Sequence, residues 1–345
     1  MSRVLITGVT GQDGAFLAKK MLEYGHNVFG SVRRGSTPKT GRLNRLGITD
    51  QVKLVGLELT EFANVYAVLN RIKPDFIYNL AAQSFVADSF MHPNLTSAIN
   101  YTGVLNILES IKLSGASTRL YQASTSEMYG EVVTKVQDES TPFSPMSPYA
   151  VSKLAAHHLV INYRKAYGIT GACGILFNHE SELRGREFVT RKITSQLAEL
   201  ANGRKTPIQL GNLDSVRDWG YADDYVDGMI KIVENEIVDD FVIATNTIHT
   251  VRDFFKVASE LAGFSPEFSG EGLDEVCICS KNRIRLCEVN EQFYRPSDVI
   301  YLRGDYTKIK NALNWSPKTS FDEMIHRMVK TDLDHVKSFG NIWDV

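Results

Sequence analysis

The feature that most constrains this chain is a glycine-punctuated turn near its start, Gly8-Val9-Thr10-Gly11-Gln12-Asp13-Gly14. The turn follows Val4-Leu5-Ile6-Thr7, which has the composition of a buried strand, and it leads into a helical pattern over residues 13–24. In this setting the first glycine permits a tight turn, the second lets a phosphate approach the backbone, and the third lets the helix pack on the strand. The free amides at the helix start would face a pyrophosphate. The turn therefore predicts a dinucleotide-binding unit.

Strand-like and helix-like segments alternate through the first half of the 345-residue chain. Strands are expected at 27–32, 53–57, 76–80 and 118–123, and helices at 61–72, 94–113 and 148–167. Because parallel strands need crossover connections, this alternation predicts a parallel sheet covered by helices on both faces. Beyond Gly174 the alternation weakens, and helices become isolated at 188–202, 251–262 and 320–337.

We therefore predict an α/β fold with a Rossmann-type doubly wound parallel sheet and a smaller C-terminal substrate-binding α/β region. The dinucleotide-binding domain is placed at residues 1–175, to whose sheet a later segment can return, and the mainly substrate-binding domain at 176–345.

Composition narrows the classes of partner. Lys and Arg total 38 against 40 Asp and Glu, so the net charge of -2 gives no electrostatic argument for a nucleic-acid or anionic-membrane partner. No apolar run reaches the ~18 residues of a membrane span, and the first strand begins too early to leave room for a signal peptide. The cysteines Cys173, Cys277, Cys279 and Cys287 lack a zinc-site spacing, and the last three sit in a hairpin-like pattern. We expect a cytoplasmic protein with reduced thiols and no metal.

The end of the second expected strand discriminates between NAD and NADP. An acidic residue there would bind the ribose hydroxyls of NAD. This chain has Val32-Arg33-Arg34-Gly35-Ser36 instead, and two guanidinium groups with a hydroxyl suit a 2′-phosphate. The sequence therefore favours NADP, and two solvated surface arginines are the alternative interpretation.

A second motif, Tyr149-Ala150-Val151-Ser152-Lys153, places a phenol and an amine on one face of a helix. The ammonium and a positive nicotinamide ring are expected to lower the proton affinity of the phenol. Tyr149 can then take a proton from a substrate alcohol as hydride leaves its carbon. The spacing is frequent by chance, but after a dinucleotide turn it predicts hydride chemistry on a hydroxyl-bearing substrate.

These motifs, with Asn79-Leu80-Ala81-Ala82-Gln83-Ser84 and the helix around Asn100, resemble the extended short-chain dehydrogenase/reductase superfamily. Within it, longer segments resemble the GDP-mannose 4,6-dehydratase family over nearly the whole chain. The segments are Gly8 to Asp13, Val32-Arg33-Arg34, Thr40-Gly41-Arg42, Gln122-Ala123-Ser124-Thr125-Ser126-Glu127, Ile175-Leu176-Phe177-Asn178-His179-Glu180-Ser181, Phe188-Val189-Thr190-Arg191-Lys192, Gly211-Asn212-Leu213-Asp214, Arg217-Asp218-Trp219-Gly220, Tyr294-Arg295-Pro296 and Asn314-Trp315. The resemblance implies a lyase, an NADP-dependent dehydratase of GDP-mannose.

A dehydratase needs a carboxylate beside the sugar, whereas a simple dehydrogenase does not. Glu127 follows an expected sheet strand, where such folds place their chemistry. Once C4 of the sugar is a ketone, Glu127 could remove the acidified C5 proton and return it to the departing C6 hydroxyl, while Thr125 orients the sugar. The other interpretation of this segment is a local turn whose hydroxyls satisfy the backbone.

The resemblance also implies ligand contacts. Around the cofactor it places Gly8, Thr10, Gly11, Gln12, Asp13, Gly14, Arg33, Arg34, Ser36, Glu58, Leu59, Leu80, Ala81, Ala82, Gln83, Ser84, Tyr149, Lys153, His179 and Arg184. Around the GDP-sugar it places Ser84, Thr125, Ser126, Glu127, Asn178, Lys192, Arg217 and Arg295. The segment from Arg33 to Arg42 resembles a family loop that reaches a neighbouring subunit, which suggests a homotetramer or a dimer.

Departures from the family pattern leave alternatives open. Glu58 replaces an Asp, Glu182-Leu183-Arg184-Gly185 replaces Pro-Arg-Arg-Gly, and Phe85, Met91-His92-Pro93 and Leu95 differ beside the expected sugar. The substrate could be another GDP-sugar, such as GDP-N-acetylglucosamine or a GDP-heptose. A nucleotide-sugar reductase or epimerase, which needs no Glu127, and a dinucleotide-binding sensor or scaffold without turnover are the remaining alternatives.

Overall fold

A seven-stranded parallel sheet forms the centre of the protein in a computed structural model that describes residues 1–33, 39–132, 134–293 and 301–342. The strands lie in the order β11-β6-β5-β4-β1-β2-β3, with β1 and β4 side by side at the middle. Their bounds are β1 Arg3–Thr7, β2 Asn27–Val32, β3 Lys53–Gly56, β4 Phe76–Asn79, β5 Arg119–Thr125, β6 Gly171–Leu176 and β11 Phe241–Ile243. The predicted α/β doubly wound fold is confirmed, and β11 is a late segment that pairs with β6.

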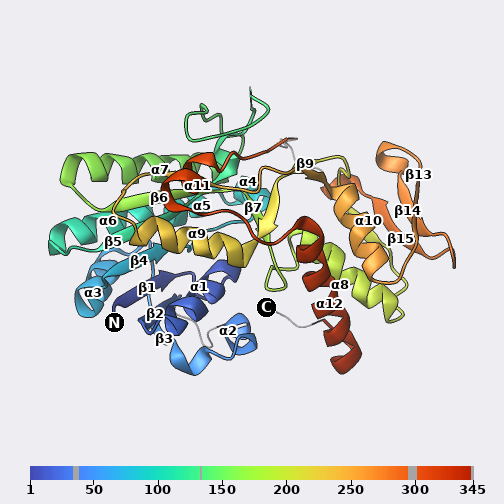
Figure 1. Cartoon of the computed structure of the whole chain (residues 1–345), viewed down its shortest axis with the longest axis horizontal. Helices are drawn as coiled ribbons and strands as arrows, with labels where there is room; N and C mark the ends of the chain where they lie inside the picture. Colours follow the sequence, from blue (N-terminus) through green and yellow to red (C-terminus); the bar gives the residue numbers. More distant parts are fainter. Residues whose placement is uncertain (34–38, 133, 294–300, 343–345) are drawn as a thin grey trace.

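Helices cover both faces of this sheet (Figure 1). One face packs against α1 (Gln12–Glu23) and α9 (Ala222–Glu234), and the other packs against α3 (Phe62–Ile72), α6 (Gly103–Ser114) and α7 (Pro148–Tyr167). Strands buried on both faces account for the continuous apolar runs of the sequence. Short helices α2 (Gly41–Arg45) and α11 (Thr307–Leu313) lie at the edges of the first face.

The expected helix over 94–113 is present as a continuous helical segment, 93–114, but a π turn in its middle was not expected. The chain forms α4 (Val86–Met91), α5 (Pro93–Ser97), a π-helical turn (Ala98–Thr102) and then α6. Asn100 sits in the π turn, where its amide bonds both the N–H and the C=O of Gln83 and also Ser152 Oγ. A side chain that bonds the backbone of another segment favours such a local widening of the helix. The hydrogen bonds of Asn100 in the π turn therefore connect this helix to the segment that follows β4.

A second, smaller core occupies the C-terminal side of the molecule, on the right of Figure 1. It contains the helices α8 (Val189–Ala201), α10 (Val251–Leu261) and α12 (Phe321–Phe339), which pack on a sheet of order β13-β14-β15-β8. The strand bounds are β8 Ile208–Leu210, β13 Pro266–Ser269, β14 Val276–Cys279 and β15 Arg285–Val289. Two further pairs, β7 (Asn178–Glu180) with β10 (Trp219–Tyr221) and β9 (Val216–Arg217) with β12 (His249–Thr250), connect this core to the large sheet.

The cysteine-containing segment forms the hairpin that the alternation predicted. Cys277 on β14 lies opposite Cys287 on β15, and all four cysteines are buried free thiols. Among the described residues, no cluster of three or more His, Cys, Asp or Glu could hold a metal ion. None of the described helices is long and apolar enough to cross a membrane.

Candidate active site

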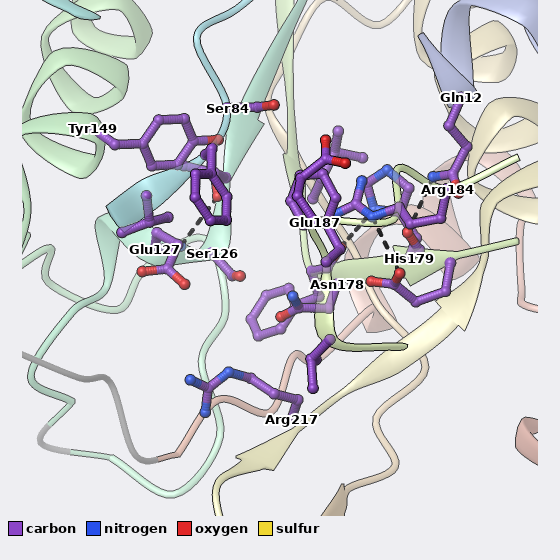
Figure 2. A pocket seen from close by; sticks show the side chains of 18 of the residues that line it. Gln12, Ser84, Ser126, Glu127, Tyr149, Asn178, His179, Arg184, Glu187 and Arg217 are labelled. Atoms are coloured by element: carbon purple, nitrogen blue, oxygen red, sulfur yellow. Dashed lines mark hydrogen bonds and ion pairs between the residues drawn. The ribbon is translucent and has the colours of Figure 1, made fainter. Parts of the chain in front are cut away.

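One pocket of about 640 Å³ lies between the two cores, at the carboxyl ends of the sheet strands. Its lining combines the glycine turn, the residues after β4, β5 and β6, the start of α7 and the start of α8. Figure 2 shows Tyr149, Glu127 and Ser126 on one side of the pocket and His179, Arg184 and Glu187 on the other. The carboxyl edge of a parallel sheet is the place where such folds bind their ligands.

The glycine turn has the close packing that its sequence predicts. Gly8 adopts φ +69°, a backbone conformation that favours glycine, and its carbonyl accepts the N–H of Gly11 at 2.9 Å. A Cβ on Gly14 would lie 2.3 Å from Gly8 O and 2.7 Å from Val9 Cα, which is too close for any side chain. The first turn of α1 thus stands directly against β1, and its free amides face the pocket.

Asp13 and Gln12, at the start of α1, bond to β7 and the residues after it. Asp13 Oδ2 lies 2.9 Å from His179 Nε2, and Gln12 Nε2 donates to the His179 carbonyl at 3.1 Å. Ser181 Oγ donates to Gln12 Oε1 at 2.7 Å. The polar side chains of the turn therefore join the glycine turn to the part of the pocket formed by the second core.

The charges in this network support one another. Burial alone would raise the pKa of Asp13, but His179, Gln12 and Arg184 together outweigh burial and the pKa is lowered. Burial would likewise lower the pKa of His179, but Asp13 raises it. The imidazole also stacks on Tyr225, with ring centroids 4.7 Å apart. The pair thus favours an imidazolium–carboxylate contact beside the pocket.

Tyr149 and Lys153 occupy one buried face of α7. The helix begins as its sequence predicts, because Ser147 Oγ accepts the Ala150 N–H at 3.1 Å and Pro148 fills the first helical position. Lys153 Nζ donates to the Ala123 carbonyl on β5 at 2.5 Å. This bond fixes the amine against the strand that carries the carboxylate segment.

The electrostatics of this pair differ from the sequence expectation. Burial raises the pKa of Tyr149 to about 12, although a hydrogen bond with Thr125 acts in the opposite direction. Burial lowers the pKa of Lys153 to about 8. The protein alone therefore does not lower the proton affinity of the phenol, because the dry surroundings oppose both charged forms. The positive charge of a nicotinamide ring would act against this burial effect.

The carboxylate segment lies at the end of β5. Thr125 Oγ1 accepts the Glu127 N–H at 3.2 Å and thereby caps a 3₁₀ turn over Ser126–Met128. The Thr125 side chain also acts on the Tyr149 phenol, whose pKa it lowers against the effect of burial. The Thr125 side chain therefore orders the backbone that carries the Glu127 carboxylate, and Thr125, Glu127 and Tyr149 all line the pocket.

A buried histidine that the sequence reasoning missed stands behind these residues. His157 lies one helical turn after Lys153 on α7, and its Nδ1 is 2.9 Å from Ser124 Oγ on β5. Burial lowers the pKa of His157 to about 4, so the imidazole is neutral near pH 7. The i, i+4 spacing from Tyr149 through Lys153 to His157 is the signal that could have indicated it.

The expected nucleotide end of the pocket collects Asn178, Lys192 and Arg217. Lys192 Nζ lies 3.4 Å from the centre of the Phe293 ring, and burial lowers its pKa to about 8. Sequence reasoning did not identify the aromatic lining of this pocket, because single aromatic residues are usually core residues. The missed lining residues are Phe188, Trp219 and Phe293, whereas Phe85 was already expected beside the sugar.

The remaining predicted cofactor residues fall into three groups. Leu80, Ala82, Ser84 and Arg184 line the pocket. Thr10, Arg33, Glu58, Leu59, Ala81 and Gln83 are described but are not among its lining residues. Arg34 and Ser36 lie outside the described residues, as does Arg295, which was expected to bind the GDP-sugar.

Arg42, at the end of the loop compared above with a family intersubunit loop, makes contacts within its own chain. Its guanidinium donates to the Thr10 carbonyl at 2.9 Å and to the Leu183 carbonyl at 2.6 Å. The contact adds a second tie between the glycine turn and the segment after β7.

Comparisons with known proteins agree over almost the full length of the chain. The sequence profile of GDP-mannose 4,6-dehydratase matches residues 5–328. The chain is 42% identical to human GDP-mannose 4,6-dehydratase, covering 98% of this chain and 93% of that protein. It is also 42% identical to the Yersinia enterocolitica GDP-mannose 4,6-dehydratase, covering 98% and 95%.

Solved structures share the fold. UDP-glucose 4-epimerase from Thermus thermophilus, in complex with NAD, superposes with a TM-score of 0.80 at 25% identity, covering 96% of this chain and 98% of that one. A Bacillus anthracis dTDP-glucose 4,6-dehydratase gives a TM-score of 0.80 at 20% identity, covering 98% of each chain. By profile and by sequence identity, this chain belongs to the GDP-mannose 4,6-dehydratase family.

Proposed function

We propose that this chain is a lyase that converts GDP-mannose to GDP-4-keto-6-deoxymannose, and that NADP is its cofactor. The observation that carries the proposal is that Tyr149, Thr125 and Glu127 line the same pocket, where the Thr125 hydroxyl accepts the backbone N–H of Glu127 and acts on the pKa of the Tyr149 phenol. Tyr149, which could deprotonate a sugar hydroxyl, and Glu127, which could deprotonate a carbon next to a ketone, therefore line the same pocket. Bound NADP would accept a hydride from C4 of the sugar and return it to C6.

In the first step Tyr149 takes the proton of the C4 hydroxyl as the hydride departs. The phenol needs help, because burial raises its pKa to about 12. Lys153, held against Ala123 O, supplies a nearby positive charge that favours the phenolate.

In the second step Glu127 removes the C5 proton, which the new C4 ketone has acidified. The carboxyl group then gives this proton to the C6 hydroxyl, and water leaves. Return of the hydride to C6 and addition of a solvent-derived proton at C5 would complete the 4-keto-6-deoxy sugar, and Tyr149 would release the proton from the C4 hydroxyl to solvent. The cofactor ends in its starting state, so the reaction consumes no external reductant.

Several finer features belong to this proposal. Arg33, exposed at the end of β2, supports NADP over NAD because a guanidinium suits a 2′-phosphate and no carboxylate occupies its position. Asn178, Lys192 and Arg217 would hold the diphosphate and guanosine. A homotetramer or a dimer and a cytoplasmic location complete the proposal, on the resemblance and on the buried free thiols.

The test is product analysis in heavy water with purified protein, NADP and GDP-mannose, with GDP-N-acetylglucosamine and a GDP-heptose in parallel. We expect mass loss of one water, a 6-methyl proton signal and deuterium at C5. If the protein converts only one of the other GDP-sugars, that sugar is its substrate and the mechanism stands. Inversion at C4, with no loss of water and no deuterium at C5, would identify an epimerase. Turnover of none of the sugars would favour a sensor.

The role of Glu127 has its own test. Glu127→Gln should still form reduced cofactor with substrate but should lose product formation by about 100-fold or more, the usual scale of a general acid–base residue. Glu131→Gln, an exposed carboxylate four residues along the same segment, is the matched control. Dehydration by Glu127→Gln at the control's rate would refute the assigned role.

A further inference from the structure

Two phenylalanine rings meet across the pocket. Phe85, the residue before α4, and Phe188, the residue before α8, both line it. Their ring centroids are 6.1 Å apart and their planes meet at 85°, an edge-to-face contact. We refer to this pair, Phe85 with Phe188, as the aromatic bridge. It joins an element of the large-sheet side to an element of the second core.

The Phe188 side of the bridge is firmly held. The Arg184 guanidinium lies 3.6 Å from the centre of the Phe188 ring, on which it stacks. Arg184 Nε in turn lies 3.1 Å from the buried Glu180 carboxylate, and Thr190 Oγ1 donates to the same carboxylate at 2.5 Å. Burial and charge pairing therefore fix this half of the bridge relative to β7 and α8.

The Phe85 side is held more loosely. Its side chain is 39% exposed, so the ring lies at the pocket mouth rather than in a core. The Phe85 carbonyl accepts a hydrogen bond from Gln83 Nε2 at 3.0 Å, and no charged group is stacked on the Phe85 ring among the described contacts, unlike the Phe188 ring. Because α4 packs on α7, a shift of Phe85 would open the pocket beside the helix that carries Tyr149.

We propose that the aromatic bridge retains the oxidised sugar in the pocket until its hydride has been returned, with Phe85 as the movable half. The inference rests on the proposed function, since only a reaction that oxidises first and reduces last needs to hold an intermediate. A fixed ring and a mobile ring in edge-to-face contact can close over a bound sugar and part again after the product forms.

The chemistry defines what escape would leave behind. The first step moves a hydride from C4 to NADP and a proton to Tyr149, giving a 4-keto sugar and NADPH. Water then leaves from C5 and C6, and the hydride returns to C6. If the keto sugar departs before that return, the protein keeps NADPH, the released sugar lacks the hydride, and the site cannot begin another cycle until NADP replaces NADPH.

The experiment compares Phe85→Ala with Phe62→Ala. Phe62 has the same 39% exposure and also contacts another ring, Tyr66 at 5.9 Å, but it does not line the pocket. Each protein, loaded with NADP, receives GDP-mannose, and we measure absorbance of stranded NADPH and the mass of every released GDP-sugar. Phe85→Ala should strand NADPH about 2- to 13-fold more often per turnover, the factor expected for one aromatic edge-to-face contact.

A second measurement does not depend on turnover. In a Tyr149→Phe background, which blocks the first step, adding Phe85→Ala should speed the release of GDP-mannose by a similar factor. Phe85→Leu keeps apolar bulk and serves if the alanine variant does not fold. Full product yield with no stranded NADPH and an unchanged release rate in the Phe85 variant would overturn the bridge, and the function would still stand. Absence of dehydration in the unmodified protein would instead overturn the proposed function.

Discussion

Replacement of Gly14 by alanine sets two opposing effects against each other. In an ordinary helix interior, alanine is favoured over glycine by about 1 kcal/mol, so propensity alone predicts a more stable protein. At this position, however, the new Cβ would lie 2.3 Å from Gly8 O and 2.7 Å from Val9 Cα. Both obstacles are backbone atoms, which cannot rotate away as the end of a side chain would.

The magnitude follows from these contacts. Overpacking costs roughly 1–3 kcal/mol, and a backbone obstacle places Gly14→Ala near the upper value. Subtracting the helix gain leaves a net loss of about 2 kcal/mol in the free energy of unfolding. With an unfolding entropy of about 2.1 cal/mol/K per residue, this corresponds to a Tm lower by roughly 3 °C.

The effect on cofactor binding should be larger. A displaced turn misdirects the amides that face the pyrophosphate, and a hydrogen bond to a charged group contributes about 1.5–3 kcal/mol. The Kd for NADP should therefore rise by about 10- to 150-fold, measured by calorimetric titration beside thermal unfolding. Gly56→Ala, whose Cβ would meet no atom within 4 Å, is the control. A Gly14→Ala protein with the Tm and NADP Kd of this control would refute the packing argument.

The remaining predictions concern the proton at Tyr149. Tyr149→Phe removes the base for the C4 hydroxyl, so stopped-flow absorbance should detect no reduced cofactor with substrate, whereas a burst like that of the unmodified protein would contradict this role. Because burial lowers the pKa of Lys153 to about 8, its ammonium is present below that pH and is lost above it, so kcat should fall as pH rises through about 8. Lys153→Arg, whose guanidinium stays charged, should move this fall to higher pH, and an unmoved profile would exclude Lys153 as its cause.

The parts of the fold that depend on local pattern could be predicted from the sequence. Ser147, Pro148 and Gly168 mark the ends of α7 by side-chain capping, ring geometry and a left-handed backbone, and the structure has each of them in that role. The strands β1 to β5 of the large sheet were identifiable because burial on both faces requires continuous apolar runs, whereas β6 and β11 were not predicted as strands.

Features that depend on distant contacts could not be predicted in this way. The π turn at Asn100 accompanies hydrogen bonds to Gln83, which is seventeen residues away. The residues near Asn100 in the sequence do not predict these bonds. The sequence indicated an amine near Tyr149, so the pKa of the phenol was expected to fall. The sequence could not indicate how deeply the fold buries the phenol, and this burial raises its pKa. The tie between Ser124 and His157 was missed for the same reason.

The bonds from Gln12 and Asp13 to the β7 segment have a thermodynamic consequence. They make the dinucleotide site and the sugar-nucleotide site share one rigid element, since Asn178 and His179 belong to the strand that α1 holds. Any factor by which NADP tightens the binding of a GDP-sugar must equal the factor by which the GDP-sugar tightens NADP. If that factor exceeds one, an abundant GDP-sugar keeps the protein loaded with its dinucleotide, and depletion of the sugar weakens retention of the cofactor as well.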